Sequence, residues 1–140
     1  MTVQYSGANS GVRKGSCVCG AIKFETRGEL RDVIFCHCEQ CRKQSGHYFA
    51  ATSVSDDRLY VSGEEQIGWY SASPSAKRGF CRNCGSALFW KREDSDATSV
   101  MAGLFDSPTG LEGGYHIFTA EKGDYYAITD GLPCFAGSKD

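Results

Sequence analysis

Short apolar and aromatic segments alternate with polar turns along most of the chain. They are bounded by Gly, Ser, Asp or Pro, and none keeps the repeat of a long amphipathic helix. The segments that we expect to form strands are 31–36, 48–54, 59–62, 66–71, 77–80, 98–102, 115–119 and 125–128. One short helix of a turn or two is expected from Glu39 to Lys43. The pattern therefore predicts a mainly β fold built from short strands.

Two further strands are expected from a pattern that occurs twice. The segment Cys19-Gly20-Ala21-Ile22-Lys23-Phe24 is similar to Cys84-Gly85-Ser86-Ala87-Leu88-Phe89. We interpret each segment as a metal-binding knuckle that enters a strand. The glycine after the cysteine fits a tight turn with positive φ, which residues with a Cβ rarely adopt.

Length and charge narrow the class of protein. A chain of 140 residues predicts one domain, which we place at residues 15–136 after a flexible leader at residues 1–14. The net charge of −2 gives no strong field toward nucleic acid or an anionic membrane, so neither partner is expected. No apolar run is long enough to span a bilayer, and the first residues lack a signal-peptide pattern. We expect a cytoplasmic protein.

The spacing of the cysteines carries the strongest chemical signal. Of the eight cysteines, all but Cys134 fall into three clusters: Cys17 with Cys19, Cys36 with Cys38 and Cys41, and Cys81 with Cys84. A cytosolic location favours metal binding over disulfides. Close spacing does so too, because a bridge between residues two apart closes a small, strained ring. We expect Cys134 to be a buried or free cysteine without an assigned role.

The clusters predict two different zinc sites. The two outer pairs can supply four thiolates to one closed, structural zinc ion, whose binding is coupled to folding. The middle cluster supplies three thiolates and leaves one position to water, an incoming thiol, Cys134 or a histidine. A protein ligand in that position would make the site structural, whereas an exchangeable ligand would allow chemistry.

The neighbours of the middle cluster have two readings each. His37 lies between two ligands and points away from their ion, so it is either a solvent-facing residue or a hydrogen-bond donor or base. Glu39 and Gln40 either begin the helix or orient a water or substrate. Four cations could bind a substrate carboxylate or be solvated surface charges: Arg42, Lys43, Arg78 and Arg82.

Several motifs resemble one enzyme family. They are Gly15-Ser16-Cys17-Val18-Cys19-Gly20, Cys36-His37-Cys38-Glu39-Gln40-Cys41-Arg42 with Gln44-Ser45-Gly46, Phe80-Cys81-Arg82-Asn83-Cys84-Gly85-Ser86, His116-Ile117-Phe118 and Asp130-Gly131-Leu132-Pro133. In this order they resemble the glutathione-dependent formaldehyde-activating enzymes, a family that includes centromere protein V-like proteins.

The resemblance implies an Mss4-like β-tent fold with two zinc ions per chain. It implies a structural zinc on Cys17, Cys19, Cys81 and Cys84, and a catalytic zinc on Cys36, Cys38 and Cys41. The implied activity is that of a carbon–sulfur lyase, which joins glutathione and formaldehyde as S-hydroxymethylglutathione. The expected partners are therefore a small thiol and an aldehyde, although no motif here specifies glutathione.

Two other functions are compatible with the sequence. The first is a non-catalytic, zinc-stabilised protein-interaction module of Mss4-like fold, with an exposed aromatic patch formed by Trp69, Tyr70, Trp90 or Tyr115. The second is a redox or metal sensor, in which oxidation of the middle cluster forms a disulfide and releases zinc. The sensor ranks last because the chain has neither a DNA-binding helix nor a basic stripe.

Overall fold

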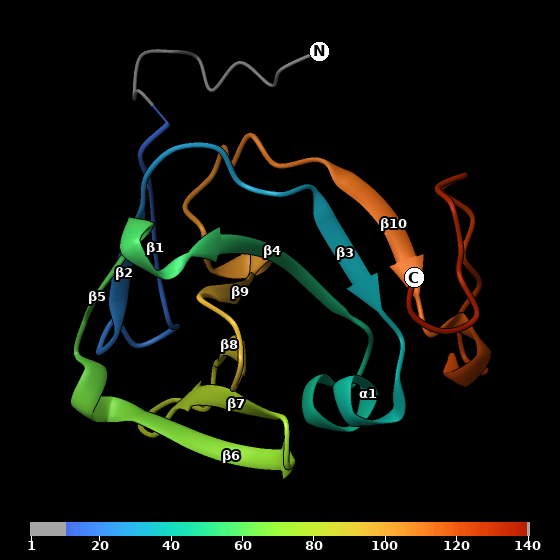
Figure 1. Ribbon diagram of the computed structural model, residues 1–140, viewed down its shortest axis with the longest axis horizontal. Helices are drawn as coiled ribbons and strands as arrows, with labels where there is room; N and C mark the ends of the chain where they lie inside the picture. The colour runs from blue at the N-terminus through green and yellow to red at the C-terminus, as the bar shows by residue number, and fades with distance from the viewer. Residues whose placement is uncertain (1–10, 140) are drawn as a thin grey trace.

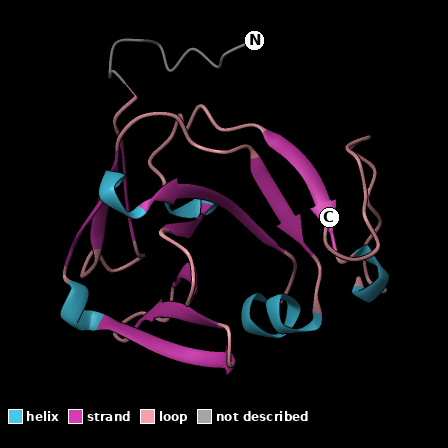
Figure 2. Ribbon diagram, in the orientation of Figure 1, coloured by secondary structure: helices cyan, strands magenta, loops and turns pink. Residues whose placement is uncertain are grey.

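The computed structural model describes residues 11–139 (Figure 1). Its strands are β1 Arg13–Ser16, β2 Lys23–Thr26, β3 Val33–Cys36, β4 Phe49–Ser55, β5 Leu59–Ser62, β6 Ile67–Ser73, β7 Ala76–Cys81, β8 Ala87–Arg92, β9 Ala97–Met101 and β10 Gly113–Ile117. The helix α1 spans Glu39–Ser45. Short 3-10 helices span Asp56–Arg58, Glu64–Gln66, Ala102–Leu104 and Thr119–Glu121. Figure 2 shows how strands dominate this architecture.

The strands form two sheets. A three-stranded sheet has the order β1-β2-β5, and a seven-stranded sheet has the order β10-β3-β4-β9-β8-β7-β6. Neighbouring strands are antiparallel except for β10 and β3, which run parallel. The larger sheet curls, so that β4 and the β6–β7 hairpin lie on opposite sides and α1 sits at the open end between them (Figure 1).

The predicted mainly β fold is confirmed. Seven of the eight expected strands are present, as is the helix, with ends that differ from the prediction by no more than two residues. The strands expected after the two knuckles are β2 and β8. Arg13 and Lys14, inside the predicted leader, already belong to β1, and residues 1–10 of that leader lie outside the described residues.

The strand predicted at 125–128 is wrong, because this segment forms turns and irregular structure. Its backbone does not pair with another strand. Instead, the Lys122 ammonium donates hydrogen bonds to the backbone carbonyls of Gly123 and Tyr126. The Tyr126 side chain packs against histidine rings. Tertiary contacts of this kind override a local β preference.

Two apolar clusters form the core, and each contains one group of metal-binding candidates. The larger cluster includes Ile22, Leu88 and Val100 and draws on both sheets, and Cys17 and Cys81 lie within it. The smaller cluster consists of Cys41, Phe49, Ala51 and Met101, with Cys36 and Cys38 packed against it. The outer cysteines therefore lie where the two sheets meet, whereas the middle cysteines lie beside α1.

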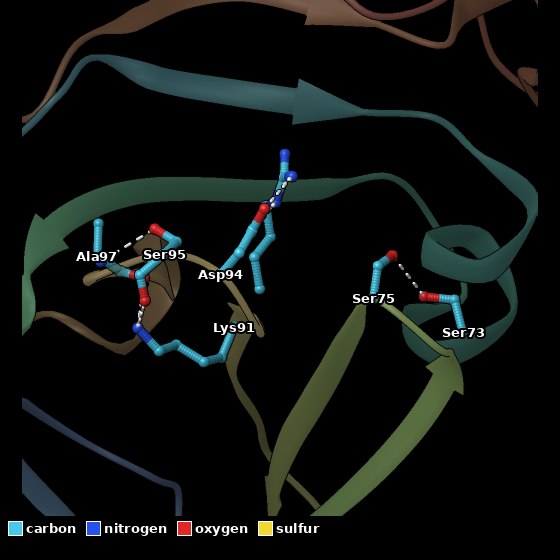
Figure 3. A network of polar contacts seen from close by, with 7 residues as sticks. Ser73, Ser75, Lys91, Asp94, Ser95 and Ala97 are labelled. Carbon is cyan, nitrogen blue, oxygen red and sulfur yellow. Dashed lines mark hydrogen bonds and ion pairs between the residues drawn. The ribbon is translucent and has the colours of Figure 1, made fainter.

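The turn between β8 and β9 is held by polar contacts (Figure 3). The Lys91 ammonium donates to the backbone carbonyl oxygens of Ser95 at 2.5 Å and Ala97 at 3.1 Å. The Ala97 amide donates in turn to the Ser95 hydroxyl at 3.1 Å. These contacts fix the relative position of β8 and β9, which carry Trp90 and Ser99 to the interior of the curled sheet.

Candidate metal centres and the adjoining cavity

The two outer cysteine pairs come together in the structure. The sulfur atoms of Cys17, Cys19, Cys81 and Cys84 all lie within 4.8 Å of one another. Cys17 Sγ and Cys19 Sγ are 3.6 Å apart, and Cys19 Sγ and Cys81 Sγ are 3.8 Å apart. A tetrahedral zinc with Zn–S bonds of about 2.3 Å requires sulfur separations of about 3.8 Å. The four thiols therefore have the spacing of a closed zinc site.

Both knuckles have the predicted turn geometry. Gly20 has φ 79° and Gly85 has φ 82°, so the expected positive φ after each second cysteine is confirmed. These turns direct backbone N–H groups at sulfur: Ile22 N lies 3.3 Å from Cys17 Sγ, and Cys84 N lies 3.4 Å from Cys81 Sγ. A hydrogen bond from the Ser86 hydroxyl lowers the pKa of the Cys84 thiol to about 5. At Cys84 this contact favours the thiolate, the form that binds metal.

The middle cluster is formed where β3 passes into α1. Cys36 ends β3, Cys38 is the N-cap of α1, and Cys41 lies in the first turn, with its backbone N–H 3.4 Å from Cys38 Sγ. The three sulfur atoms lie within 4.8 Å of one another. Hydrogen bonds from Cys36 and Cys41 lower the pKa of the Cys38 thiol to about 2, and the contact with Cys38 raises the pKa of Cys36. Negative charge is therefore favoured at Cys38.

Within residues 11–139, this group contains three metal-donor side chains and no fourth. Cys134, a possible fourth ligand in the sequence, is an exposed thiol whose sulfur lies 3.6 Å from the carbonyl oxygen of Leu132. Cys134 was expected to be buried or free, and it is a free thiol on the surface. The two buried histidines near the cluster, His37 and His116, contact each other instead.

A cavity of about 300 Å³ adjoins the middle cluster. Cys36, Cys38 and Cys41 line it from one side. Most of the other walls are apolar and come from the curled sheet: Ile34, Phe49, Ala51, Ala76, Trp90, Met101, Ile117 and Phe118. The hydroxyls of Ser73 and Ser75, 3.3 Å apart at the β6–β7 turn, add polar groups (Figure 3). A small molecule in this cavity would lie against the thiols.

Of the four cations singled out in the sequence, Arg78 lines this cavity and the other three do not. Arg78 is buried with 5% of its surface exposed, so its reading as a solvated surface charge is wrong. Arg78 lies two residues after the buried Ala76, so both side chains point to the same face of β7. This alternation is the sequence signal that indicates its burial. Lys43 pairs with Glu39 at 3.2 Å on the exposed side of α1. Arg31, which no motif of the sequence singles out, also lines the cavity.

His37 is buried with 0% exposure, so its reading as a solvent-facing residue is also wrong. Its Nδ1 lies 2.5 Å from the hydroxyl of Tyr126, and its Nε2 lies 2.8 Å from Nδ1 of His116. The Nε2 atom of His116 lies 2.8 Å from Asp130 Oδ2. Burial lowers the pKa of His37 to about 4. This buried chain joins the peptide between two cysteines of the middle cluster to the C-terminal segment.

Removing the central histidine of this chain should destabilise the protein. We expect His116→Ala to lower the free energy of unfolding by about 1–3 kcal/mol, because His37 then keeps a buried nitrogen without its partner. Urea unfolding followed by circular dichroism measures the change. Glu65→Ala, at an exposed residue away from this buried chain, is the control and should change stability by about 0.5 kcal/mol or less. Equal losses in both variants would contradict a structural role for the chain.

The aromatic residues that would serve an interaction module are unevenly exposed. Trp69 and Tyr70 on the edge strand β6 are 41% and 64% exposed. Trp90 and Tyr115 are half-buried, and Trp90 lines the cavity. The four residues therefore do not form one exposed patch, while the cavity beside the middle cluster matches the enzymatic reading.

Comparisons with known proteins agree with the motifs. A family model described as "Glutathione-dependent formaldehyde-activating enzyme" matches residues 12–121. An uncharacterised lyase of Schizosaccharomyces pombe is 38% identical over 77 residues, which cover 55% of this chain and 56% of that protein. A crystal structure of a Rhodobacter sphaeroides protein superposes with a TM-score of 0.57 at 24% identity, covering 87% of this chain and 98% of the other. The last comparison supports the fold.

Proposed function

Because this chain belongs to the family of glutathione-dependent formaldehyde-activating enzymes, we propose that it is a zinc-dependent carbon–sulfur lyase. Its substrates would be a small, glutathione-like thiol and an aldehyde, or their S-hydroxymethyl adduct. The observation that carries this proposal is the cavity of about 300 Å³ lined by Cys36, Cys38 and Cys41. Three thiols that converge on such a cavity are placed to act on a ligand, whereas the four outer thiols converge on one another.

The donor sets fit one zinc ion each. Cys17, Cys19, Cys81 and Cys84 would hold a structural ion, and Cys36, Cys38 and Cys41 would hold a catalytic one. Zinc bound by the middle cluster would supply a Lewis acid that favours the thiolate form of a substrate thiol. Cysteine thiolates bind zinc well, whereas magnesium and calcium prefer oxygen donors, so both donor sets fit zinc.

The residues of the cavity would position the reactants. Its apolar walls exclude water and hold the carbon skeleton of the thiol or aldehyde. The Arg31 guanidinium, whose Nη2 donates to the carbonyl oxygen of Ala51 at 2.9 Å, presents a cation to a substrate carboxylate. The reaction forms one carbon–sulfur bond and transfers the thiol proton to the carbonyl oxygen, so it needs no oxidant or reductant. Holding both reactants in contact is a large part of catalysis for such an addition.

Calorimetry and exchange spectroscopy test this proposal together. We expect the zinc-loaded protein to bind glutathione or another small thiol in isothermal titration. We also expect it to accelerate exchange between formaldehyde, thiol and adduct in NMR. Cys134→Ser should behave like the wild type, because that thiol lies outside both clusters. If no thiol binds and the middle zinc has four protein ligands, the proposal fails.

We also propose that the protein is located in the cytoplasm. All eight cysteines are free thiols, as expected for a reducing compartment such as the cytoplasm. None of the helices in residues 11–139 combines the length and apolar character required to cross a bilayer. Neither nucleic acid nor membrane is part of the proposed reaction.

A further inference from the structure

Arg78 of β7 is a buried cation. Among the ion pairs found in residues 11–139, none involves its guanidinium. Its Nη1 donates to Gln44 Oε1 at 3.1 Å and its Nη2 to Gln40 Oε1 at 3.3 Å, and both acceptors are neutral amides. A buried charge without a counter-charge is strongly unfavourable. The structure must therefore supply negative charge from another group.

The middle cysteine cluster would supply that charge with zinc bound. Nη1 and Nη2 of Arg78 each lie 3.6 Å from Cys41 Sγ, so the guanidinium spans one sulfur atom with both of its terminal nitrogens. Three thiolates and one divalent zinc sum to a charge of about −1. The single positive charge of Arg78 would therefore neutralise a zinc ion bound by the three cysteines.

The outer cluster differs from the middle one in its polar contacts. Its sulfur atoms receive hydrogen bonds from the backbone of Ile22 and Cys84 and from the Ser86 hydroxyl. Among the hydrogen bonds of the described residues, none joins a lysine or arginine side chain to an outer thiol. Four thiolates on a divalent zinc would carry a charge of about −2 and are met there by N–H and O–H groups, so a cation is no general requirement of such a site. The buried Arg78 guanidinium is therefore a feature of the middle cluster, which has three cysteines.

The guanidinium is held in this place by contacts from α1 and β4. Gln40 and Gln44 lie four residues apart on α1, so both amides face β7 from the same side of the helix. The ring of Phe49 lies against the guanidinium, with 5.2 Å between its centroid and the Arg78 Cζ. Within the described residues, Arg78 Nε has no hydrogen-bond partner. The residue also lines the cavity, so it faces both the thiols and any ligand there.

We propose that Arg78 is a specificity-determining residue that adapts the three-cysteine centre to an anionic sulfur ligand. The inference rests on the proposed function and adds the reason why a thiolate is preferred over a neutral ligand. A thiolate that joins the centre changes its charge from about −1 to about −2, and the adjacent guanidinium offsets this increase. A neutral ligand changes no charge and gains nothing from the arginine.

The test compares two probes on zinc-loaded full-length protein by calorimetry. The probes are 2-mercaptoethanol, which binds metal as an anion, and imidazole, which binds as a neutral ligand. We expect Arg78→Gln to weaken binding of 2-mercaptoethanol about tenfold or more, while imidazole binding changes less than about threefold. Arg78→Lys keeps the charge and should recover most of the loss. Arg92→Gln, at an exposed arginine paired with Asp94, should match the wild type.

Metal content and thermal unfolding of each variant show whether the centre is intact. If Arg78→Gln does not fold, Arg78→Met places an unbranched apolar chain in the same buried position and carries the same expectation. Equal weakening of both probes, or no weakening of the thiol, would overturn the role of Arg78 while leaving the proposed lyase function standing. A wild-type protein that binds no thiol at all would overturn both.

Discussion

Replacing Cys17 or Cys84 with serine is expected to abolish stable folding. The four outer thiols lie within 4.8 Å of one another, and they join the loop after β1 to the knuckle between β7 and β8. Structural zinc contributes an apparent free energy of about 10–16 kcal/mol in small peptides, against a net stability of about 5–15 kcal/mol for a typical domain. Loss of one ligand should therefore remove most or all of the stability.

Circular dichroism, urea unfolding and zinc content per chain measure this effect. Cys134→Ser is the matched control, because its exposed thiol belongs to neither group of metal-donor side chains. A Cys17→Ser protein with the zinc content and unfolding midpoint of the wild type would contradict a structural role for the outer site. Removal of zinc by a strong chelator should reproduce the unfolding of the variants in the wild-type chain.

Replacing Cys41 with serine is expected to have the second large effect, on ligand binding rather than on folding. Cys41 is buried beside α1, contacts Arg78 and lines the cavity. Its loss should lower the zinc content from two ions per chain to one and abolish thiol binding and exchange activity. The loss of stability should be smaller than at the outer site, because Cys36, Cys38 and Cys41 lie close together in the sequence. They can hold zinc in the unfolded chain too, and binding to the unfolded state reduces the stability that a ligand confers on the folded one.

The contrast between the two sites is the decisive part of this prediction. Zinc content and urea unfolding should be measured on Cys17→Ser, Cys84→Ser and Cys41→Ser under the same conditions. Equal losses of stability in all three variants would contradict the division into a structural and a catalytic site. A Cys41→Ser protein that retained two zinc ions and thiol binding would exclude the middle cluster as the reactive centre.

The two cysteine groups could be predicted from the sequence because their geometry is mostly local. Residues two or three apart at a strand end or a tight turn already place their sulfur atoms close together. The knuckle glycines, Gly20 and Gly85, follow from the same local turn chemistry and have the positive φ that it requires. The joining of the first and last clusters depended on the family resemblance, since spacing alone does not pair segments more than 60 residues apart.

The surroundings of the middle cluster depend on tertiary structure, and the prediction that His37 or Arg78 faces solvent is wrong. His37 is buried because the C-terminal segment brings Tyr126 and His116 against it, which no local pattern indicates. Arg78 is buried because the sheet curls and places β7 opposite α1. The parallel pairing of β10 with β3 joins strands far apart in the chain and was likewise absent from the sequence pattern.

X-ray absorption at the zinc edge tests the central claim most directly, because it counts sulfur ligands with and without a substrate thiol. The outer site should keep four sulfur ligands, and the middle site should have three from the protein, giving about 3.5 per zinc on average. Addition of a saturating thiol should raise the average to about 4. An average that does not change on addition of thiol, with a fourth protein donor at the middle site, would contradict an exchangeable three-cysteine centre.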